Sequence, residues 1–314
     1  MSDRLPPLTA LRAFDAAARH MSFARAAAEL NVTPAALSFQ IKSIEDHLGT
    51  PLFRRLNRAV ELTEAGRTLA PGAAEGFQTL TKAWRNTRRL NDTRTLTVTA
   101  GPAFTSKWLA PRLYEFAQSH PDIELRFSAS LRIIDFDLDE VDVAIRFGLG
   151  NDKDVYSDPL NREWMTPMMT SRLAEQIKTP EDLQKAVLIH DDSISFFKSP
   201  ADWAAWCRAA GITIDTSHGP RFSQADHAID AAISGAGVIL GRVSLATQAL
   251  ETGLLVAPFK VGLVCDAHFR FICPLGSEMR PNIAAFHRWI KDKMRASAAF
   301  DQNRIFVQSK DLAP

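Results

Sequence analysis

Three arginines lie close together in the segment FRRLNRAVEL, which reads as a short β-hairpin from Phe53 to Leu62. Arg54, Arg55 and Arg58 carry guanidinium groups, which bind phosphate oxygens and can enter a minor groove narrowed by A·T sequence. An arginine triplet alone is usually a solvated surface. Beside helices that could enter DNA, it predicts a wing that clamps the phosphate backbone.

The segment before this hairpin predicts a helix with a short-chained, weakly charged outer face. Thr33 can cap free N–H groups, Pro34 suits a first helical turn, and Gly49 favours the helix end. Such a face fits the major groove, although it could also be the solvated side of a generic three-helix bundle. The residues expected to contact double-stranded DNA are Arg25, Thr33, Pro34, Ala35, Ser38, Phe39, Gln40, Lys42, Arg54, Arg55 and Arg58.

Polar residues at the ends of later strands predict a binding site for a small molecule, which could be anionic. Thr105 and Ser106 follow a strand and open a helix, where free N–H groups and hydroxyls could hold an anion; an ordinary capped helix is the alternative. Arg146 could pair with that anion or with Asp135 or Asp137. The expected contact residues are Phe104, Thr105, Ser106, Arg146, Phe147, Phe222, Ser223 and Gln224.

Catalysis and metal binding are not indicated. The eight histidines fall outside triad or metal-ligand spacing, and the segment SGAGVILG lacks the context of a dinucleotide motif. The three cysteines, Cys207, Cys265 and Cys273, form no CxxC pair. A redox switch between Cys265 and Cys273 is conceivable, but buried inert thiols are the simpler reading. We therefore expect no enzyme, no cofactor and no metal.

The DNA-contacting residues must be positioned by the segment from Leu8 to Leu48. Apolar residues recur at helical spacing from Leu8 to Ala18, Ser22 can cap a second short helix, and a tight break at Asn31 precedes the third. Two short helices followed by a longer one form a helix-turn-helix.

A long helix is expected from Thr63 to about Leu90, interrupted at Pro71-Gly72. Its apolar stripe predicts a coiled coil with the same helix of a second chain, which would present two recognition helices to an inverted repeat. Packing on the chain's own C-terminal body is the alternative. The stripe consists of Leu69, Ala73, Phe77, Leu80 and Trp84.

Alternating strand and helix patterns after residue 91 predict a mostly parallel sheet covered by helices. Strands are expected at Leu96–Ala100, Ile123–Ser130, Val141–Gly148, Met165–Thr170, Val187–His190, Gly237–Gly241 and Phe269–Pro274. The tail from Phe300 to Pro314 is expected to be loosely held.

The run LTALRAFDAAARHMSFARAAAELNVTPAALSFQIKSIEDHLGTPLFRR, followed by LTEAG, resembles the DNA-binding part of LysR-type transcriptional regulators. The opening RLPPLTALRAFDAAARHMSF is similar to the branch that contains the glycine-cleavage activator and the β-lactamase regulator. Later landmarks such as KWLAPRLYEF, VDVAIRFG and AAISGAGVIL extend the resemblance over nearly the whole chain. One departure is Phe39, where the family usually has Arg or His.

The resemblance implies an α/β fold with an all-α winged helix-turn-helix domain and a periplasmic-binding-protein-like domain of two α/β subdomains. The expected parts are the DNA-binding domain (1–62), a dimerisation helix (63–91) and an effector-binding domain (92–314). Its subdomain I would hold about 92–165 and 265–300, and subdomain II about 166–264, with chain crossings near Met165 and Val264.

The resemblance also implies a homodimer or homotetramer on promoter DNA, a small-molecule effector in the cleft and altered recruitment of RNA polymerase. A regulator switched by redox state or protein contacts is the alternative, and a solute-binding or enzymatic α/β domain is a weaker one. The stretch Gly150–Trp164 departs from the branch, so the effector's identity does not carry over.

Charge is distributed unevenly along the 314 residues. Residues 1–90 contain 13 Lys and Arg against 8 Asp and Glu, net +5, whereas the remainder has 24 against 28, net −4. A basic head on an acidic body suits a DNA-binding module joined to a part that does not touch DNA. No apolar run approaches the roughly 18–20 residues of a membrane span, and MSDRLPPL lacks a signal region, so we expect a cytoplasmic protein.

Overall fold

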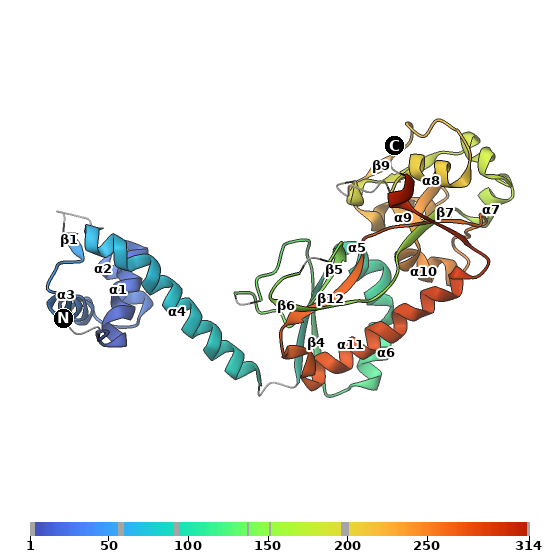
Figure 1. The fold of residues 1–314 in the computed structure, drawn as a ribbon. Coiled ribbons are helices and arrows are strands. Elements are labelled where there is room, and N and C mark those ends of the chain that lie inside the picture. Colours follow the sequence, from blue (N-terminus) through green and yellow to red (C-terminus); the bar gives the residue numbers. More distant parts are fainter. Residues whose placement is uncertain are drawn as a thin grey trace. The chain divides into compact units, whose positions relative to one another are not determined.

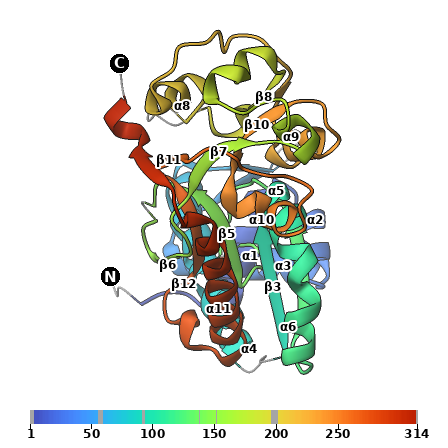
Figure 2. The same ribbon diagram turned by 90° about the vertical axis from the view of Figure 1, so that its right-hand side faces the viewer.

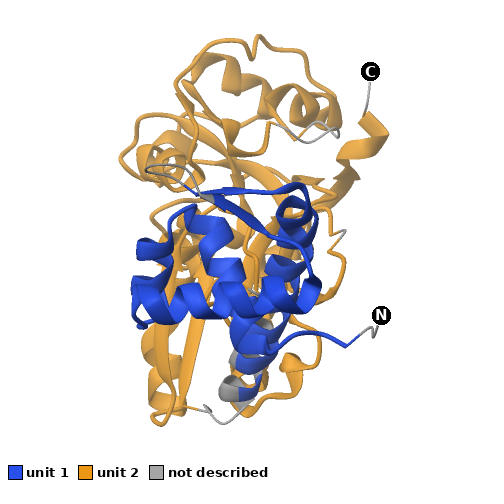
Figure 3. Ribbon diagram, turned by 90° about the vertical axis from the view of Figure 1, so that its left-hand side faces the viewer, with its two compact units in different colours: residues 1–91 blue, residues 92–314 orange. Residues whose placement is uncertain are grey.

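A computed structural model describes residues 4–55, 60–90, 94–136, 138–150, 152–195 and 201–312. The chain divides into two compact units, residues 1–91 and 92–314 (Figure 3).

The N-terminal unit begins with three helices, α1 (Leu8–His20), α2 (Phe23–Glu29) and α3 (Pro34–Leu48) (Figure 1). Side chains cap the second and third helices: Ser22 accepts a hydrogen bond from the Arg25 N–H, and Thr33 from the Ala36 N–H. Helix α3 ends at Gly49, whose φ of +74° is a left-handed conformation that glycine adopts without strain. The expected helix-turn-helix is therefore present.

The wing follows α3 directly. Strands β1 (Phe53–Arg55) and β2 (Val60–Leu62) pair in antiparallel fashion, with Phe53 opposite Leu62 and Arg54 opposite Glu61. Leu52 and Phe53 are buried in the core of the three helices. Burial of these two apolar residues therefore attaches the hairpin to the helices.

Helix α4 (Glu64–Leu90) is continuous, so the expected interruption at Pro71-Gly72 is wrong. A single proline removes one backbone hydrogen bond, and the turns on either side keep theirs. Pro71 and Gly72 are exposed, so water can reach the carbonyl that loses its partner. Helical structure thus persists through the proline.

The apolar stripe of α4 has two halves. Leu69, Ala73 and Phe77 are partly buried against the core of the N-terminal unit. Leu80 and Trp84 are 53% and 68% exposed. The first half therefore packs on the helices of its own unit, a neighbour that neither sequence-based alternative named.

In the C-terminal unit, α6 (Leu113–Ser119) and α11 (Pro281–Met294) pack against a five-stranded sheet (Figures 1 and 2). Its strand order is β4 (Glu124–Ala129), β3 (Thr95–Ala100), β5 (Val143–Gly148), β12 (His268–Pro274) and β6 (Val155–Pro159). This sheet and its helices form subdomain I.

A six-stranded sheet forms subdomain II, together with α7 (Ser171–Ala174), α8 (Trp203–Ala210), α9 (Ala225–Ile233) and α10 (Val243–Glu251) (Figure 2). Its strand order is β13 (Ile305–Gln308), β11 (Val261–Val264), β7 (Trp164–Met168), β10 (Val238–Arg242), β8 (Leu188–Asp191) and β9 (Arg221–Phe222).

Both sheets are mostly parallel, as expected, and each contains one reversed strand. Strand β12 pairs antiparallel with β5 and β6, and β7 pairs antiparallel with β10 and β11. Strands β7 and β12 each follow a crossing from the other subdomain. In these two cases the strand runs opposite to every other strand of its sheet.

The chain passes between the subdomains a third time, after α11. Strand β13 pairs in parallel with β11, so the tail is not loosely held as expected. The Arg304 guanidinium donates to the carbonyls of Ala257 and Phe259, and the Phe306 ring packs edge-on against Trp164, with 5.2 Å between ring centroids. These contacts hold β13 against the second sheet, which the sequence pattern of this short segment did not predict.

Glu163 connects the first two chain segments that cross between the subdomains. Its side chain is buried and accepts hydrogen bonds from the backbone N–H and the hydroxyl of Ser244, while its carbonyl accepts one from the Cys265 N–H at 3.0 Å. Burial raises the pKa of Glu163, and the bonds from Ser244 oppose that rise. The backbone of Glu163 thus joins the two crossing segments, while its buried carboxyl group bonds Ser244 at the start of α10.

Candidate DNA interface and ligand cleft

Most of the residues predicted to enter the groove are on the surface of α3. Thr33, Pro34, Ala35, Phe39 and Lys42 are exposed, and Phe39 is 70% exposed. Ser38 and Gln40 are half-buried. Most of this side chain is open to solvent, so it is accessible to the edge of a base or a sugar.

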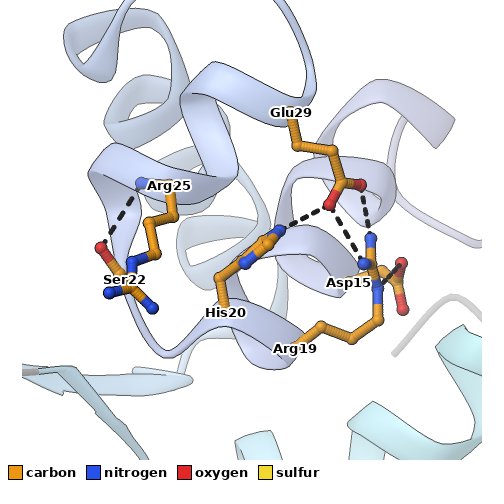
Figure 4. Close-up of polar contacts among 6 residues, drawn as sticks. All are labelled: Asp15, Arg19, His20, Ser22, Arg25 and Glu29. Carbon is orange, nitrogen blue, oxygen red and sulfur yellow. Dashed lines mark hydrogen bonds and ion pairs between the residues drawn. The ribbon is translucent and has the colours of Figure 1, made fainter.

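Arg25 is exposed on α2, beside the N-cap residue Ser22 (Figure 4). Arg54 is exposed on β1. The backbone of Arg55 pairs with that of Val60, and its side chain lies outside the described part of the structure. Arg58 also lies outside the described residues.

The placement of α4 against the wing depends on one close backbone approach. A Cβ at Gly66 would lie 2.2 Å from the carbonyl oxygen of Leu52, so only glycine fits there. Thr63 caps α4 by accepting a hydrogen bond from the Gly66 N–H, and its hydroxyl donates to the Pro51 carbonyl. The wing and α4 are thereby fixed to each other.

An ionic cluster joins α1 to α2 and was not predicted from the sequence. The Arg19 guanidinium donates two hydrogen bonds to the Glu29 carboxylate, at 2.6 and 3.1 Å, and one to Asp15 at 3.2 Å (Figure 4). His20 Nε2 lies 2.6 Å from Glu29. Arg19, and after it His20, lowers the pKa of Glu29 to about 2. The cluster links the end of α1 to the end of α2.

The C-terminal unit contains a cavity of about 830 Å³ between its two subdomains. Its volume lies in the range of roughly 300–1,000 Å³ that is usual for small-molecule sites. Of the predicted contact residues, it brings together Phe104, Arg146 and Phe147 from subdomain I with Ser223 and Gln224 from subdomain II.

Thr105, Ser106 and Phe222 do not line this cavity. The helix starts at Pro102, so the Thr105 N–H is already bonded to the Gly101 carbonyl at 2.9 Å. The Ser106 hydroxyl lies 3.3 Å from the Asp226 carboxylate, on α9 of the facing subdomain. Phe222 is half-buried in the short strand β9. The predicted anion site at Thr105 and Ser106 therefore does not form as described.

The guanidinium group of Arg146 forms hydrogen bonds with neutral groups. Its guanidinium donates to the carbonyls of Ile145 and Arg132 at 3.0 and 3.2 Å, and to the Thr99 hydroxyl at 3.4 Å. Among the described residues no carboxylate forms an ion pair with it, and Asp137 lies outside them. Burial lowers the pKa of Arg146.

Two further arginines line the cavity, and the sequence analysis missed both. Arg242 donates to Asp191 at 3.1 Å and Ser193 at 3.0 Å, and its guanidinium carbon lies 4.8 Å from the centroid of the Phe147 ring. Arg270 forms an ion pair with Asp152. Each arginine interrupts an otherwise apolar strand, GVILGR and HFRFICP, and that interruption was the available signal.

Burial suppresses ionisation of the cysteine thiols. Cys207, Cys265 and Cys273 are free and buried, and burial raises the pKa of Cys265 to about 11 and that of Cys273 to about 12. Within the described ranges, no three His, Cys, Asp or Glu side chains are grouped as metal ligands. No described helix is both long and apolar enough to cross a membrane.

Two family models match the chain. Residues 8–67 match the bacterial regulatory helix-turn-helix protein, lysR family, and residues 91–295 match the LysR substrate binding domain. The chain belongs to the LysR family of transcriptional regulators.

Individual relatives agree with this assignment. The regulator is 43% identical over 300 residues to the glycine cleavage system transcriptional activator of Escherichia coli K12, covering 94% of this chain and 96% of that protein. It is 34% identical to the HTH-type transcriptional activator AmpR of Rhodobacter capsulatus, covering 90% of this chain and 96% of that one. The branch expected from the opening residues is thus confirmed.

A solved structure resembles the regulator's C-terminal unit. The effector domain of AmpR from Pseudomonas aeruginosa aligns with a TM-score of 0.53 and 26% identity, covering 66% of this chain and 98% of that one. The expected architecture, a winged helix-turn-helix followed by an effector domain of two α/β subdomains, is therefore present.

Proposed function

We propose that this LysR-type regulator binds promoter DNA as a homodimer or homotetramer, and that a small molecule in the cleft modulates its DNA binding or its activation of transcription. The observation that carries the proposal is the cavity of about 830 Å³ with walls from both subdomains. A ligand there would contact both walls at once, so it would favour one relative orientation of the subdomains.

The N-terminal unit would hold the DNA. The α3 residues Thr33, Pro34, Ala35, Ser38, Phe39, Gln40 and Lys42 would face the major groove, with Arg25 beside them and Arg54, Arg55 and Arg58 on the phosphates. A wing of arginines supplies affinity that is independent of sequence, while the helix face supplies selectivity.

Dimerisation would use the exposed half of the α4 stripe. Leu80 and Trp84 are large apolar residues that stay exposed on this helix, and such residues on a long helix favour a partner of the same kind. Leu69, Ala73 and Phe77 would support the interface by fixing α4 to its own unit.

Coupling between ligand and DNA would follow from a population shift. A ligand that binds one arrangement of the subdomains more tightly raises the population of that arrangement. In a dimer or tetramer, this would change the spacing of the DNA-binding units, the bend of the DNA and contacts with RNA polymerase.

DNA binding is tested by selecting duplexes from a random library with the full chain, and with a chain that lacks residues 1–62 as the control. We expect the full chain to enrich an interrupted inverted repeat and the shortened chain to enrich nothing. Equal retention of selected and scrambled duplexes by the full chain would contradict the proposal.

Effector action is tested by a thermal-shift screen of amino acids, aromatic acids and cell-wall fragments, followed by footprinting with each compound that raises the melting temperature. We expect a compound that binds to change the affinity or the length of the protected DNA. A compound that binds in the cleft and leaves both unchanged would show that the cleft does not control DNA binding.

A further inference from the structure

Arg146 and Arg270 lie opposite each other on adjacent strands. They are register partners in the antiparallel pair β5 and β12, and both line the cavity. Directly opposed residues of an antiparallel pair project from the same face of a sheet, and like charges in such a pair destabilise it. The sheet therefore keeps two guanidinium groups side by side at the cavity wall, at a cost in stability.

Protein carboxylates offset only part of this positive charge. Asp152 pairs with Arg270 and Asp191 with Arg242, whereas Arg146 is held by carbonyls and a hydroxyl. The cationic residues of the lining are Arg146, Lys153, Arg242 and Arg270, and Asp152 is the one carboxylate among the described lining residues.

The space around Arg270 is shaped by two glycines. A Cβ at Gly148 would lie 3.0 Å from its Nη2 atom, and one at Gly150 would lie 3.3 Å from its Cδ atom. Gly150 also has a φ of +78°, a conformation that favours glycine. The backbone of the strand end thus makes room for a buried guanidinium beside Arg146.

Apolar side chains also line the cavity. The Phe269 ring lies 4.6 Å from that of Phe104 and 4.9 Å from that of Phe147, measured between centroids, and all three rings line the cavity. Leu131 and Ile133 also line it and are 68% and 90% exposed. Exposed apolar side chains at a cavity gain stability when an apolar group covers them.

We propose that the cleft binds an organic acid with an apolar body, whose carboxylate pairs with Arg146 while the body covers Leu131 and Ile133. This inference rests on the proposed function, because it names the chemical class of that function's effector. An incoming carboxylate would give Arg146 the negatively charged partner that it lacks among the described residues. Such a contact is charge-assisted and often bidentate.

The test measures binding to the full chain without DNA, by isothermal titration calorimetry. The probes are 3-phenylpropionate, indole-3-acetate and octanoate, each beside its primary amide, with acetate as an anion that has no apolar body. We expect at least one of the three acids to bind, its amide to bind at least about tenfold more weakly, and acetate not to bind measurably.

Arg146→Gln removes the positive charge, so it should weaken binding of the acid by at least about tenfold. Arg126→Gln is the matched control, since Arg126 is an exposed arginine on β4 that pairs with Glu124 and does not line the cavity. Lys153→Glu, at an exposed lining residue, is a second variant that should fold normally. It should weaken binding of the acid several-fold. Melting curves without ligand check that each variant is folded.

Three results would overturn the inference: amides that bind as tightly as their acids, a folded Arg146→Gln variant with unchanged affinity, or no binding by any of the three acids. Because DNA is absent, these outcomes are independent of the proposed function. An acid that binds as expected but leaves the DNA complex unchanged would contradict the proposed function and leave the ligand class standing.

Discussion

The Glu45 carboxylate accepts a hydrogen bond from the Leu52 N–H at 2.8 Å, and the same oxygen accepts one from the Phe53 N–H at 3.1 Å. One side chain of the recognition helix α3 thereby fixes the start of the wing. This contact connects the helix that carries the residues proposed to face the groove with the hairpin that carries those proposed to contact phosphate.

Glu45→Ala should lower the free energy of unfolding of the N-terminal unit by about 1–3 kcal/mol, because two partly buried N–H groups lose a charged acceptor. Asp46→Ala, at the exposed neighbour, should change it by less than about 0.5 kcal/mol. Urea unfolding followed by circular dichroism measures both. Equal effects of the two substitutions would show that the wing does not depend on Glu45.

Arg55→Ala should weaken binding to all duplexes about equally, as expected for a phosphate contact. The slope of the logarithm of the binding constant against the logarithm of the salt concentration should become shallower by about one. Fluorescence anisotropy over a series of salt concentrations measures the slope. Arg208→Ala, at an exposed arginine of α8, is the control. A variant that loses one operator but keeps its full affinity for random DNA would assign Arg55 to base recognition instead.

Phe39→Arg should alter the preferred half-site, because an arginine can donate two hydrogen bonds to guanine where phenylalanine can only pack on a methyl group or a sugar. The side chain is 70% exposed, so the substitution should leave folding intact. Selection from a random duplex library compares the two proteins. Identical selected sequences would mean that Phe39 does not face the bases.

Stability should also depend on pH through Glu29. Its pKa falls from 4.5 to about 2 in the folded chain, so its ionic contacts contribute fully above pH 4.5, and the contribution disappears as the pH falls towards about 2. Because the side chains are partly exposed, the effect should stay below about 1 kcal/mol. Glu29→Gln should speed hydrogen exchange of α1 and α2 amides at pH 7 more than at pH 3, and Glu75→Gln should not. Equal acceleration at both pH values would contradict the assignment.

The native thiols should react slowly with Ellman's reagent at pH 8. Raised pKa values of about 11 and 12 leave roughly one thiolate in a thousand or fewer, and the thiols are also buried. All three should react at once in denaturant. Rapid native reaction of Cys265 together with altered DNA affinity would instead favour a redox-switched regulator.

The N-terminal unit was predictable because its signals are local. Caps at Ser22 and Thr33, the stop at Gly49 and the hairpin after Phe53 each act within a few residues. The same kind of signal located β3, β4, β5, β7, β8, β10 and β12 in the C-terminal unit, but it missed β6, β9, β11 and β13.

The cleft was predictable only in part, because its charged wall is assembled from distant segments. Arg146 meets Arg270 through strand pairing across more than a hundred residues, and Arg242 arrives from the other subdomain. No spacing rule in the chain connects these positions. The reversed direction of β7 and β12 was missed for a related reason, since it appears only in their pairing with strands that are distant in the sequence.

Strand β13 gives the C-terminus a role that a tail would not have. It covers the outer hydrogen-bonding edge of β11, at the end of the second sheet. A chain shortened before Ile305 would leave that edge bare, and an uncovered edge strand is a template on which a second molecule can add its own strand. Removal of the segment from Ile305 onward should therefore promote association through the edge of β11.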